Sequence, residues 1–336
     1  RYLLKNTLIF TLGNIGSRMI SFFLIPLYTN VLTTSQYGTV DLITTISTVA
    51  GPMLTLNIAE SVMRFGLDKD ADKEKNTQCG SIVLLIAMII GLVLIPICRC
   101  ITEVSDYAMY VYFYVISLSA SQLFLCDLRG KELLLKYSLG NILQTLMIAI
   151  LNITFLLVFK METGGYLLAY IIANFIVAIY AIIAGKGYKA FSFHNIDRCK
   201  LKEMIRYSVV LIPNTFMWWI MNSSDRVMVT YMIGAAANGI YAVSYKLPTL
   251  VSTLTGIFNQ AWSYSAIREE GTSDETEYNN KMFKTLSAIA FMMGIGLLLL
   301  TKPFLGVYVA DSYYDAWKYT PFLIIGCVYL TLGTFM

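Results

Sequence analysis

The sequence has 336 residues, of which 57% are hydrophobic and only 14% are charged, with a formal net charge of +4. Soluble domains carry about 25% charged residues, so this composition excludes an ordinary soluble enzyme or a nucleic-acid-binding domain. The six cysteines show no CxxC pair and no metal-ligand spacing with histidine, and we expect no metal and no cofactor. Apolar runs of about 20 residues recur along the chain, as a bilayer core about 30 Å thick requires of a helix. The sequence therefore predicts an all-α polytopic membrane protein.

The apolar runs and the residues that interrupt them predict ten membrane-spanning helices. The basic residues are distributed unequally between the connecting segments: 18 of the 25 fall on the side that holds the N-terminus, and four fall on the other side. By the positive-inside rule, this asymmetry predicts a cytoplasmic N-terminus. The predicted spans are residues 7–29, 39–63, 79–98, 107–127, 138–159, 165–185, 207–231, 239–262, 285–301 and 320–336.

The first two spans resemble the seventh and eighth when the chain is shifted by 200 or 201 residues. The segment QYGTVDL (36–42) then aligns with ANGIYAV (237–243). Six spans separate the copies, so both have the same orientation, which is typical of transporters with parallel repeats. The polar residues that recur along the second and eighth spans fit a cavity lining, and they equally fit the small-residue packing of membrane helices.

This repeat predicts two lobes of six helices. We expect an N-lobe over residues 1–185, a basic cytoplasmic linker over 186–206 and a C-lobe over 207–336. The tenth span ends at Met336 with no closing loop, so the C-lobe is predicted to be incomplete, with about four helices in this sequence.

Three basic residues lie inside predicted spans: Arg18, Arg226 and Lys246. Each would cost about 2.5–3.5 kcal/mol at a helix centre, so such groups usually face a wet cavity or an acidic partner. Arg18 lies about 16 Å from either end of its helix, which is a long reach for a side chain seeking the membrane surface. Asp41 or Glu60 are alternative structural partners for it. Arg226 and Lys246 lie closer to the outer surface, where snorkelling is the competing interpretation.

The seventh span carries a polar stripe at four-residue intervals, formed by Asn214, Trp218, Asn222 and Arg226. Asn14 lies on the same face as Arg18 in the first span. Asp225 points about 100° away from Arg226, because adjacent residues on a helix do not face each other. We therefore predict two groups of site residues. The substrate-binding candidates are Asn14, Arg18, Asn214, Trp218, Asn222, Arg226 and Lys246, and the candidates for ion coupling or charge partnership are Asp41, Glu60 and Asp225.

Two stretches, LKNTLIFTLGNIGSRMISFFLIPLYTNVLTTSQYGTVDL and NSSDRVMVTYMIGAAANGIYAVSYKLP, resemble the polysaccharide or oligosaccharide flippases (Wzx type) of the multidrug/oligosaccharidyl-lipid/polysaccharide (MOP) exporter superfamily. The resemblance covers the whole chain through loose motifs. It implies a MATE-like fold of two six-helix lobes around a central cavity, in the bacterial cytoplasmic membrane. The implied activity is movement of an undecaprenyl-pyrophosphate-linked oligosaccharide from the cytoplasmic to the outer leaflet by alternating access, for cell-surface polysaccharide export.

The same resemblance implies partners and roles for the buried charges. Cationic cavity residues would receive the pyrophosphate, and Arg18, Arg226 and Lys246 match that role. Membrane lipids, Na⁺ or H⁺, glycosyltransferases and a polymerase are the implied partners. Because the sequence contains no GxxxxGK[ST] motif, we expect no nucleotide-hydrolysing site that would drive transport.

Three alternatives remain open. A cation-coupled multidrug exporter of the same superfamily would use a membrane-embedded carboxylate, and Asp225 keeps that interpretation open. A lipid II flippase would share the substrate chemistry. A membrane-bound sugar polymerase or ligase would need acidic residues or a large loop on the outer side, and the visible outer loops are short, so we expect no enzymatic activity.

Overall fold

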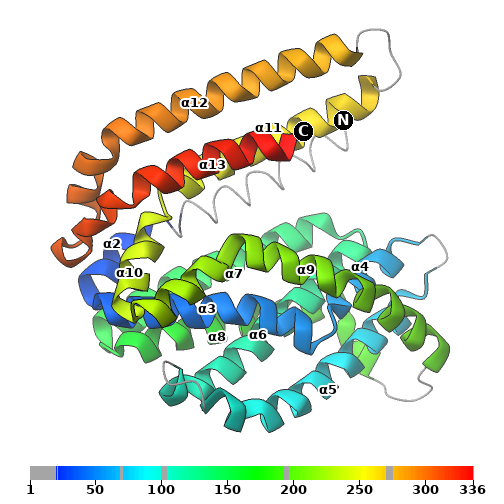
Figure 1. Cartoon of the computed structure of the whole chain (residues 1–336). Coiled ribbons are helices and arrows are strands. Elements are labelled where there is room, and N and C mark those ends of the chain that lie inside the picture. Colours follow the sequence, from blue (N-terminus) through cyan, green and yellow to red (C-terminus); the bar gives the residue numbers. More distant parts are fainter. Residues whose placement is uncertain are drawn as a thin grey trace. The chain divides into compact units, whose positions relative to one another are not determined.

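The computed structural model describes residues 20, 22–68, 71–99, 104–191, 197–269 and 275–335, and these residues form helices and turns without a strand. The all-α polytopic prediction is confirmed (Figure 1). The α-helices are α2 (Ile25–Val31), α3 (Thr34–Leu54), α4 (Ile58–Gly66), α5 (Lys73–Arg99), α6 (Ala108–Gly130), α7 (Leu134–Ile153), α8 (Glu162–Ala184), α9 (Arg198–Met232), α10 (Ala235–Ser244), α11 (Pro248–Glu269), α12 (Glu275–Tyr308) and α13 (Thr320–Phe335). Short helical turns connect some of them: η1 (Ser105–Tyr107), η2 (Thr154–Val158), η3 (Gly187–Phe191) and η4 (Asp311–Lys318).

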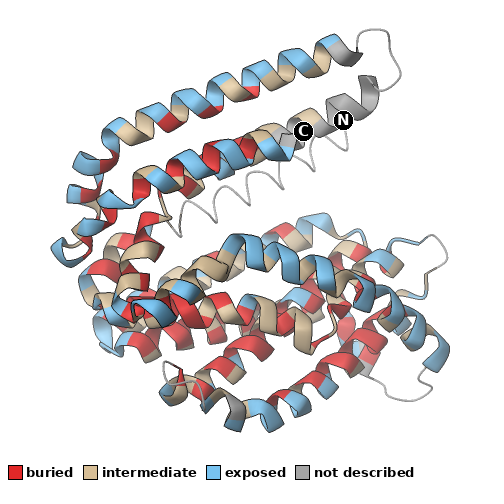
Figure 2. Cartoon of the chain, in the orientation of Figure 1, coloured by how far each residue is buried: buried red, intermediate tan, exposed pale blue. Residues whose placement is uncertain are grey.

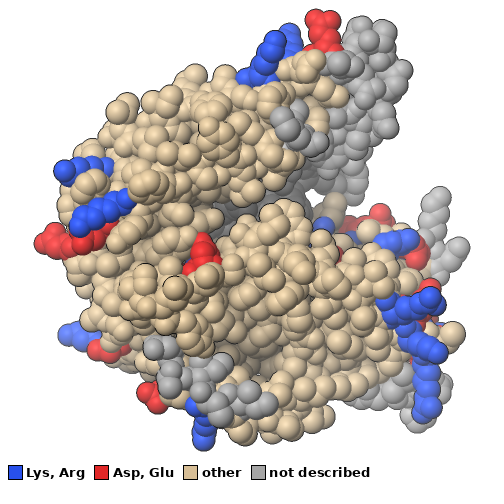
Figure 3. Space-filling model, viewed as in Figure 1, with Lys and Arg blue, Asp and Glu red and all other residues tan. Residues whose placement is uncertain are grey.

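Five of the described helical segments are long and apolar enough to cross a membrane: Lys73–Pro96, Ser105–Gly130, Leu134–Val158, Glu162–Ala184 and Glu277–Tyr308. The pair α3 and α4 adds a sixth span if the two bent pieces count as one. On the face drawn in Figure 3, most charged side chains lie towards the edges of the view, and uncharged atoms cover most of the surface between them. The remaining predicted spans stay predictions; residues 207–231 lie inside α9, and a turn at residues 245–247 interrupts 239–262.

The chain divides into two compact units. Unit 1 comprises Arg1–Leu24 and Ser35–Asn238, and unit 2 comprises Ile25–Thr34 and Gly239–Met336. Short helix α2 thus belongs with α11, α12 and α13, which lie far from it in sequence. The predicted lobe limits at 185 and 207 stay predictions, and α9 begins at Arg198, where the carboxylate of Asp197 accepts the backbone N–H of Lys200.

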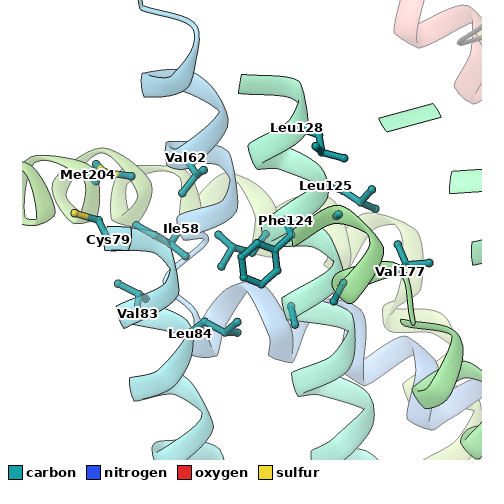
Figure 4. Close-up of a cluster of buried hydrophobic side chains, with 14 residues drawn as sticks. Ile58, Val62, Cys79, Val83, Leu84, Phe124, Leu125, Leu128, Val177 and Met204 are labelled. Carbon is teal, nitrogen blue, oxygen red and sulfur yellow. The ribbon is translucent and has the colours of Figure 1, made fainter. Parts of the chain in front are cut away.

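In unit 1, α6 packs against α4, α5 and α8, and α9 packs against α4 and α5. A buried apolar cluster joins these helices, with Phe124 of α6 among Ile58 of α4, Val83 and Leu84 of α5 and neighbouring side chains (Figure 4). Figure 2 shows buried residues gathered along α6, with many exposed residues on α9. The core therefore holds α4, α5, α6, α8 and α9 as one framework, on which the polar residues below are positioned.

Two glycines let α4 and α6 approach closely. A Cβ atom added at Gly66 would lie 2.8 Å from the Cα atom of Gly130, closer than real Cβ contacts. Small residues allow such backbone contact between membrane helices. This close contact fixes the spacing of α4 and α6, two helices that contribute to the site.

The span formed by α3 and α4 is broken. Pro52 lies inside α3, where proline lacks an N–H and its ring clashes with the preceding turn. Residues 55–57 leave the helix, Leu56 and Asn57 take left-handed backbone angles (φ 51° and 55°), and α4 continues at a bend of 60°. A left-handed conformation costs a residue other than glycine about 1–2 kcal/mol, so the break is maintained by its surroundings.

Unit 2 packs α11, α12 and α13 side by side around Val251, Ala290 and Val328. Tyr313 is fully buried in η4, and its hydroxyl donates to the carbonyl of Leu32, 2.9 Å away. The backbone N–H of Ala310 donates to the Thr29 hydroxyl at 3.3 Å. These bonds tie the segment around α2 to the loop that precedes α13.

Candidate functional site

An ion pair links α3 and α9 inside unit 1. The Arg226 Nη1 atom lies 3.0 Å from Asp41 Oδ1, and the two side chains are 19% and 7% exposed. Asn238 supports the carboxylate from the other side: its Nδ2 lies 3.4 Å from Asp41 Oδ2 and donates to the carbonyl of Gly38 at 2.9 Å. The pair thus neutralises a carboxylate and a guanidinium that would each be costly inside a membrane.

This pair belongs to a longer row of interhelical hydrogen bonds, which we call the α3–α9 seam. Trp219 Nε1 donates to the carbonyl of Thr45 at 2.9 Å, Asn57 Nδ2 donates to Thr215 Oγ1 at 3.2 Å, and Ser61 Oγ donates to the carbonyl of Met204 at 3.0 Å. Because α4 continues α3 after the break, the seam follows both helices. It leaves the opposite face of α9 available for other contacts.

The seam explains why a charged pair of neighbours, Asp225 and Arg226, lies within α9. Arg226 pairs with Asp41 on α3. Adjacent residues on a helix point about 100° apart, so Asp225 does not point in the same direction as Arg226. Asp225 Oδ1 instead accepts the backbone N–H of Arg226 at 2.9 Å. The two adjacent charges therefore have different partners.

Beside the seam, unit 1 contains a cavity of about 750 Å³. Such a volume falls within the usual range of 300–1,000 Å³ for small-molecule sites. Helices α3, α4, α6, α7 and α9 contribute to its wall, and the break in the α3–α4 span contributes Asn57. The lining residues are Pro52, Asn57, Ala59, Glu60, Leu118, Ser121, Gln122, Leu125, Cys126, Tyr137, Asn141, Gln144, Tyr207, Leu211, Asn214 and Thr215.

Some polar side chains in this lining are already engaged. Asn57 bonds Thr215, Gln144 Nε2 donates to Asn174 Oδ1 at 2.7 Å, and the Ser121 hydroxyl donates to the carbonyl of Leu118 at 2.8 Å. These bonds hold the cavity wall in place. They also orient α7 against α8, which carries Asn174.

Four other polar side chains make no hydrogen bond or ion pair with the described part of the chain: Glu60, Gln122, Asn141 and Asn214. They come from four different helices, α4, α6, α7 and α9. All four are half-buried or exposed rather than sealed in the core. Convergent polar groups in a membrane-embedded cavity are available to a polar ligand, because lipid offers them no partner.

The structure does not bring the predicted site residues together at one place. Glu60 and Asn214 line the cavity, Asp41 and Arg226 form the seam, and Asp225 lies beside it. Trp218 and Asn222 are exposed on α9, where Asn222 Nδ2 donates to the carbonyl of Trp218 at 2.7 Å. Lys246 is half-buried in unit 2, in the turn between α10 and α11. Asn14 and Arg18 lie outside the described residues. Their assigned roles stay predictions.

Sequence reasoning missed Asn57, Gln122 and Asn141. The sequence of α7 contained a usable pattern: Tyr137, Asn141 and Gln144 recur at intervals of four and three residues, which places them on one face of the helix. Gln122 is a single amide on α6 and offered no such pattern. Asn57 could be placed in the cavity lining only once the break between α3 and α4 was known.

One hydrogen bond in unit 1 joins the start of α10 to α3. The fully buried Asn238 donates to the carbonyl of Gly38, and both residues belong to unit 1. The segments that the internal repeat aligns, QYGTVDL and ANGIYAV, lie in α3 and α10, and the repeat itself stays a prediction.

Comparison with known proteins identifies the family. Residues 3–264 match the family model Polysacc_synt, described as "Polysaccharide biosynthesis protein". No curated protein sequence matches the chain.

Several solved membrane transporters share the fold. A mutant of the Vibrio cholerae MATE transporter VcmN is 13% identical with a TM-score of 0.60, over 99% of this chain and 83% of that chain. An outward-facing multidrug resistance MATE family transporter of the MOP superfamily is 14% identical with a TM-score of 0.59, over 99% of this chain and 80% of that chain. An inward-facing one is 12% identical with a TM-score of 0.56, over 96% and 84%.

At these identities the structural likeness concerns the fold alone, whereas the family model covers most of the sequence. The chain therefore belongs to the polysaccharide biosynthesis protein family and has the fold of the MATE transporters of the MOP superfamily, as the sequence motifs predicted.

Proposed function

We propose that this multi-pass membrane protein is a flippase that moves an undecaprenyl-pyrophosphate-linked oligosaccharide from the cytoplasmic to the outer leaflet by alternating access. The observation that carries the proposal is the polar cavity of about 750 Å³ inside a helix bundle of a polysaccharide biosynthesis family member. A sugar chain needs such a passage because its hydroxyl groups cannot cross hydrocarbon without hydrogen-bond partners. Broken helices at a substrate site are typical of transporters, and the α3–α4 break lies at the cavity wall.

The pyrophosphate would be received by basic residues inside the membrane. Arg18, Arg226 and Lys246 are the proposed ligands, since guanidinium groups bind phosphate in a fork geometry. For Arg226, the phosphate would have to replace Asp41, whose carboxylate now occupies Nη1. Substrate binding is thereby linked to the α3–α9 seam.

A membrane potential negative inside would favour outward movement of the anionic lipid by about 2.3 kcal/mol per charge per 100 mV. Coupling to Na⁺ or H⁺ is therefore optional for this function. We place the protein in the bacterial cytoplasmic membrane with a cytoplasmic N-terminus, beside the glycosyltransferases that supply the substrate and the polymerase that consumes it.

The test is leaflet translocation in proteoliposomes that contain undecaprenyl-pyrophosphate-linked oligosaccharide extracted from the source cells. We expect the protein to accelerate the appearance of sugar in the opposite leaflet, with a further increase under an imposed potential. A parallel assay with lipid II as the substrate distinguishes this function from that of a lipid II flippase. Lack of acceleration with every sugar lipid would refute the proposal.

One observation favours a second candidate function, a cation-coupled multidrug exporter. Glu60 brings a carboxylate to the cavity that also contains Tyr137 and Tyr207, a combination that suits an organic cation. Efflux of tetraphenylphosphonium driven by a proton or sodium gradient, and lost in Glu60→Gln, would support this function. The flippase is preferred because the family match concerns polysaccharide biosynthesis.

A further inference from the structure

We propose that the unit 1 cavity is a subsite for the uncharged sugar residues of the substrate, and that Gln122, Asn141 and Asn214 select the glycan there. This inference rests on the proposed flippase function and divides the substrate into two parts. The sugar residues bind within the cavity, and the pyrophosphate binds elsewhere, at basic residues.

The charge of the lining supports this division. Among the described lining residues, Glu60 is the single charged side chain and no lysine or arginine is present. A pyrophosphate placed in this cavity would face Glu60 in the lining itself, and like charges in contact disfavour a ligand strongly. Arg129 lies outside the lining, with its guanidinium 5.5 Å from the centre of the Tyr137 ring. A neutral sugar meets no such penalty. Glu60 can accept hydrogen bonds from its hydroxyl groups.

The hydrogen-bonding chemistry fits sugars. An amide side chain offers one carbonyl acceptor and two N–H donors, and a sugar hydroxyl both donates and accepts, so each amide can bond two neighbouring hydroxyls. Gln122, Asn141 and Asn214 provide three such amides from α6, α7 and α9, and none is engaged with the described part of the chain. Because the three amides come from three helices, a sugar in the cavity can bond to more than one helix.

Two other amide side chains in the cavity lining have hydrogen-bond partners. Gln144 lines the same cavity and bonds Asn174, and Asn57 bonds Thr215. Gln122, Asn141 and Asn214 lie in the same wall without such partners. Aromatic rings of Tyr137 and Tyr207 add amphipathic faces against which the apolar face of a sugar ring can pack. The division between engaged and available amides assigns the first group to structure and the second to ligand binding.

The test compares two probes on purified full-chain protein: undecaprenyl-pyrophosphate-linked oligosaccharide extracted from the source cells, and sugar-free undecaprenyl pyrophosphate. Wild-type protein should bind the glycosylated lipid more tightly. Gln122→Leu and Asn141→Leu keep the approximate size of the side chain and remove its hydrogen bonds. Each should weaken binding of the glycosylated lipid about five-fold, the value of one net hydrogen bond, and leave the affinity for the sugar-free lipid unchanged.

Gln36→Leu is the matched control. Gln36 is a half-buried amide outside the cavity whose Nε2 atom donates to Glu162 at 2.6 Å, so its loss should leave both affinities unchanged. Unfolding midpoints in detergent verify that each variant folds. Where a leucine variant fails this check, Gln122→Ala or Asn141→Ala replaces it.

The two proposals fail differently. If wild-type protein prefers the glycosylated lipid and the leucine variants retain the full preference, the sugar subsite is wrong and the flippase stands. If the variants lose affinity for both lipids equally, the cavity binds the pyrophosphate and the division of the substrate is wrong. If wild-type protein shows no preference for sugar and binds tetraphenylphosphonium through Glu60, the flippase function itself is refuted.

Discussion

The α3–α9 seam and the three cavity amides Gln122, Asn141 and Asn214 differ in whether their polar groups have partners among the described residues. In the seam, Asp41, Arg226, Trp219 and Thr45 bond one another across two helices. In the cavity, Gln122, Asn141 and Asn214 make no hydrogen bond to the described residues. A polar residue in a membrane helix is thus either a structural contact or a ligand contact, and the arrangement of neighbouring helices separates the two. Substitutions should therefore affect stability in the seam and binding in the cavity.

The largest effect on stability is expected in the seam at Arg226. Arg226→Met leaves the Asp41 carboxylate buried without its cation, and breaking one side of a buried ion pair costs about 3–5 kcal/mol. Denaturant unfolding in detergent micelles measures the loss. The double variant Arg226→Met/Asp41→Leu should regain most of it, because two apolar residues replace the pair. A single variant as stable as wild type would show that the seam does not stabilise unit 1.

The next largest effect is expected where α4 and α6 touch. Gly66→Ala adds a methyl group 2.8 Å from the backbone of Gly130, and overpacking of this kind costs about 1–3 kcal/mol. The unfolding midpoint should fall accordingly. Gly296→Ala on α12 is the control, because no described atom beyond its own stretch of helix lies within 4 Å of the added methyl group. Equal midpoints for both variants would contradict the close contact.

A smaller effect is expected for a neutral hydrogen bond of the seam. Trp219→Phe removes the donor to the Thr45 carbonyl and keeps most of the aromatic ring. Interhelical hydrogen bonds in membrane proteins are worth about 0.6 kcal/mol on average, so the free energy of unfolding should fall by about that amount. A loss as large as that of Arg226→Met would mean that the indole packing, rather than the hydrogen bond, holds the seam.

The smallest effect on stability is expected in the cavity. Asn141→Leu removes a side chain that makes no hydrogen bond to the described residues, so the free energy of unfolding should change by no more than about 0.5 kcal/mol. Gln144→Leu on the same helix breaks the bond to Asn174 and should destabilise by about 1 kcal/mol. The two unfolding curves measured side by side test the distinction. A destabilised Asn141→Leu would place Asn141 among the structural residues.

Much of the fold follows from local sequence properties. Apolar length predicted membrane helices, and the described residues include five helices long and apolar enough to span a membrane, or six if α3 and α4 count as one span. The sequence predicted residues 39–63 as one span, whereas the helix breaks at residues 55–57, where Leu56 and Asn57 take the left-handed conformation after Pro52. That conformation is unfavourable locally and is held by packing, which a sequence pattern does not encode.

For the candidate site, too, some features could be predicted from the sequence and others depend on the tertiary structure. The cost of charge in a membrane identified Asp41, Glu60 and Arg226 as notable, and the sequence motifs identified the superfamily. The sequence alone determined which residues need a polar environment, because hydrophobicity and helical periodicity are properties of single segments. The tertiary structure decided that Arg226 pairs with Asp41 on another helix, 185 residues away in the chain, and that Gln122 and Asn141 face a cavity. Partners from distant helices meet only after the bundle packs, so their pairing is a property of the fold.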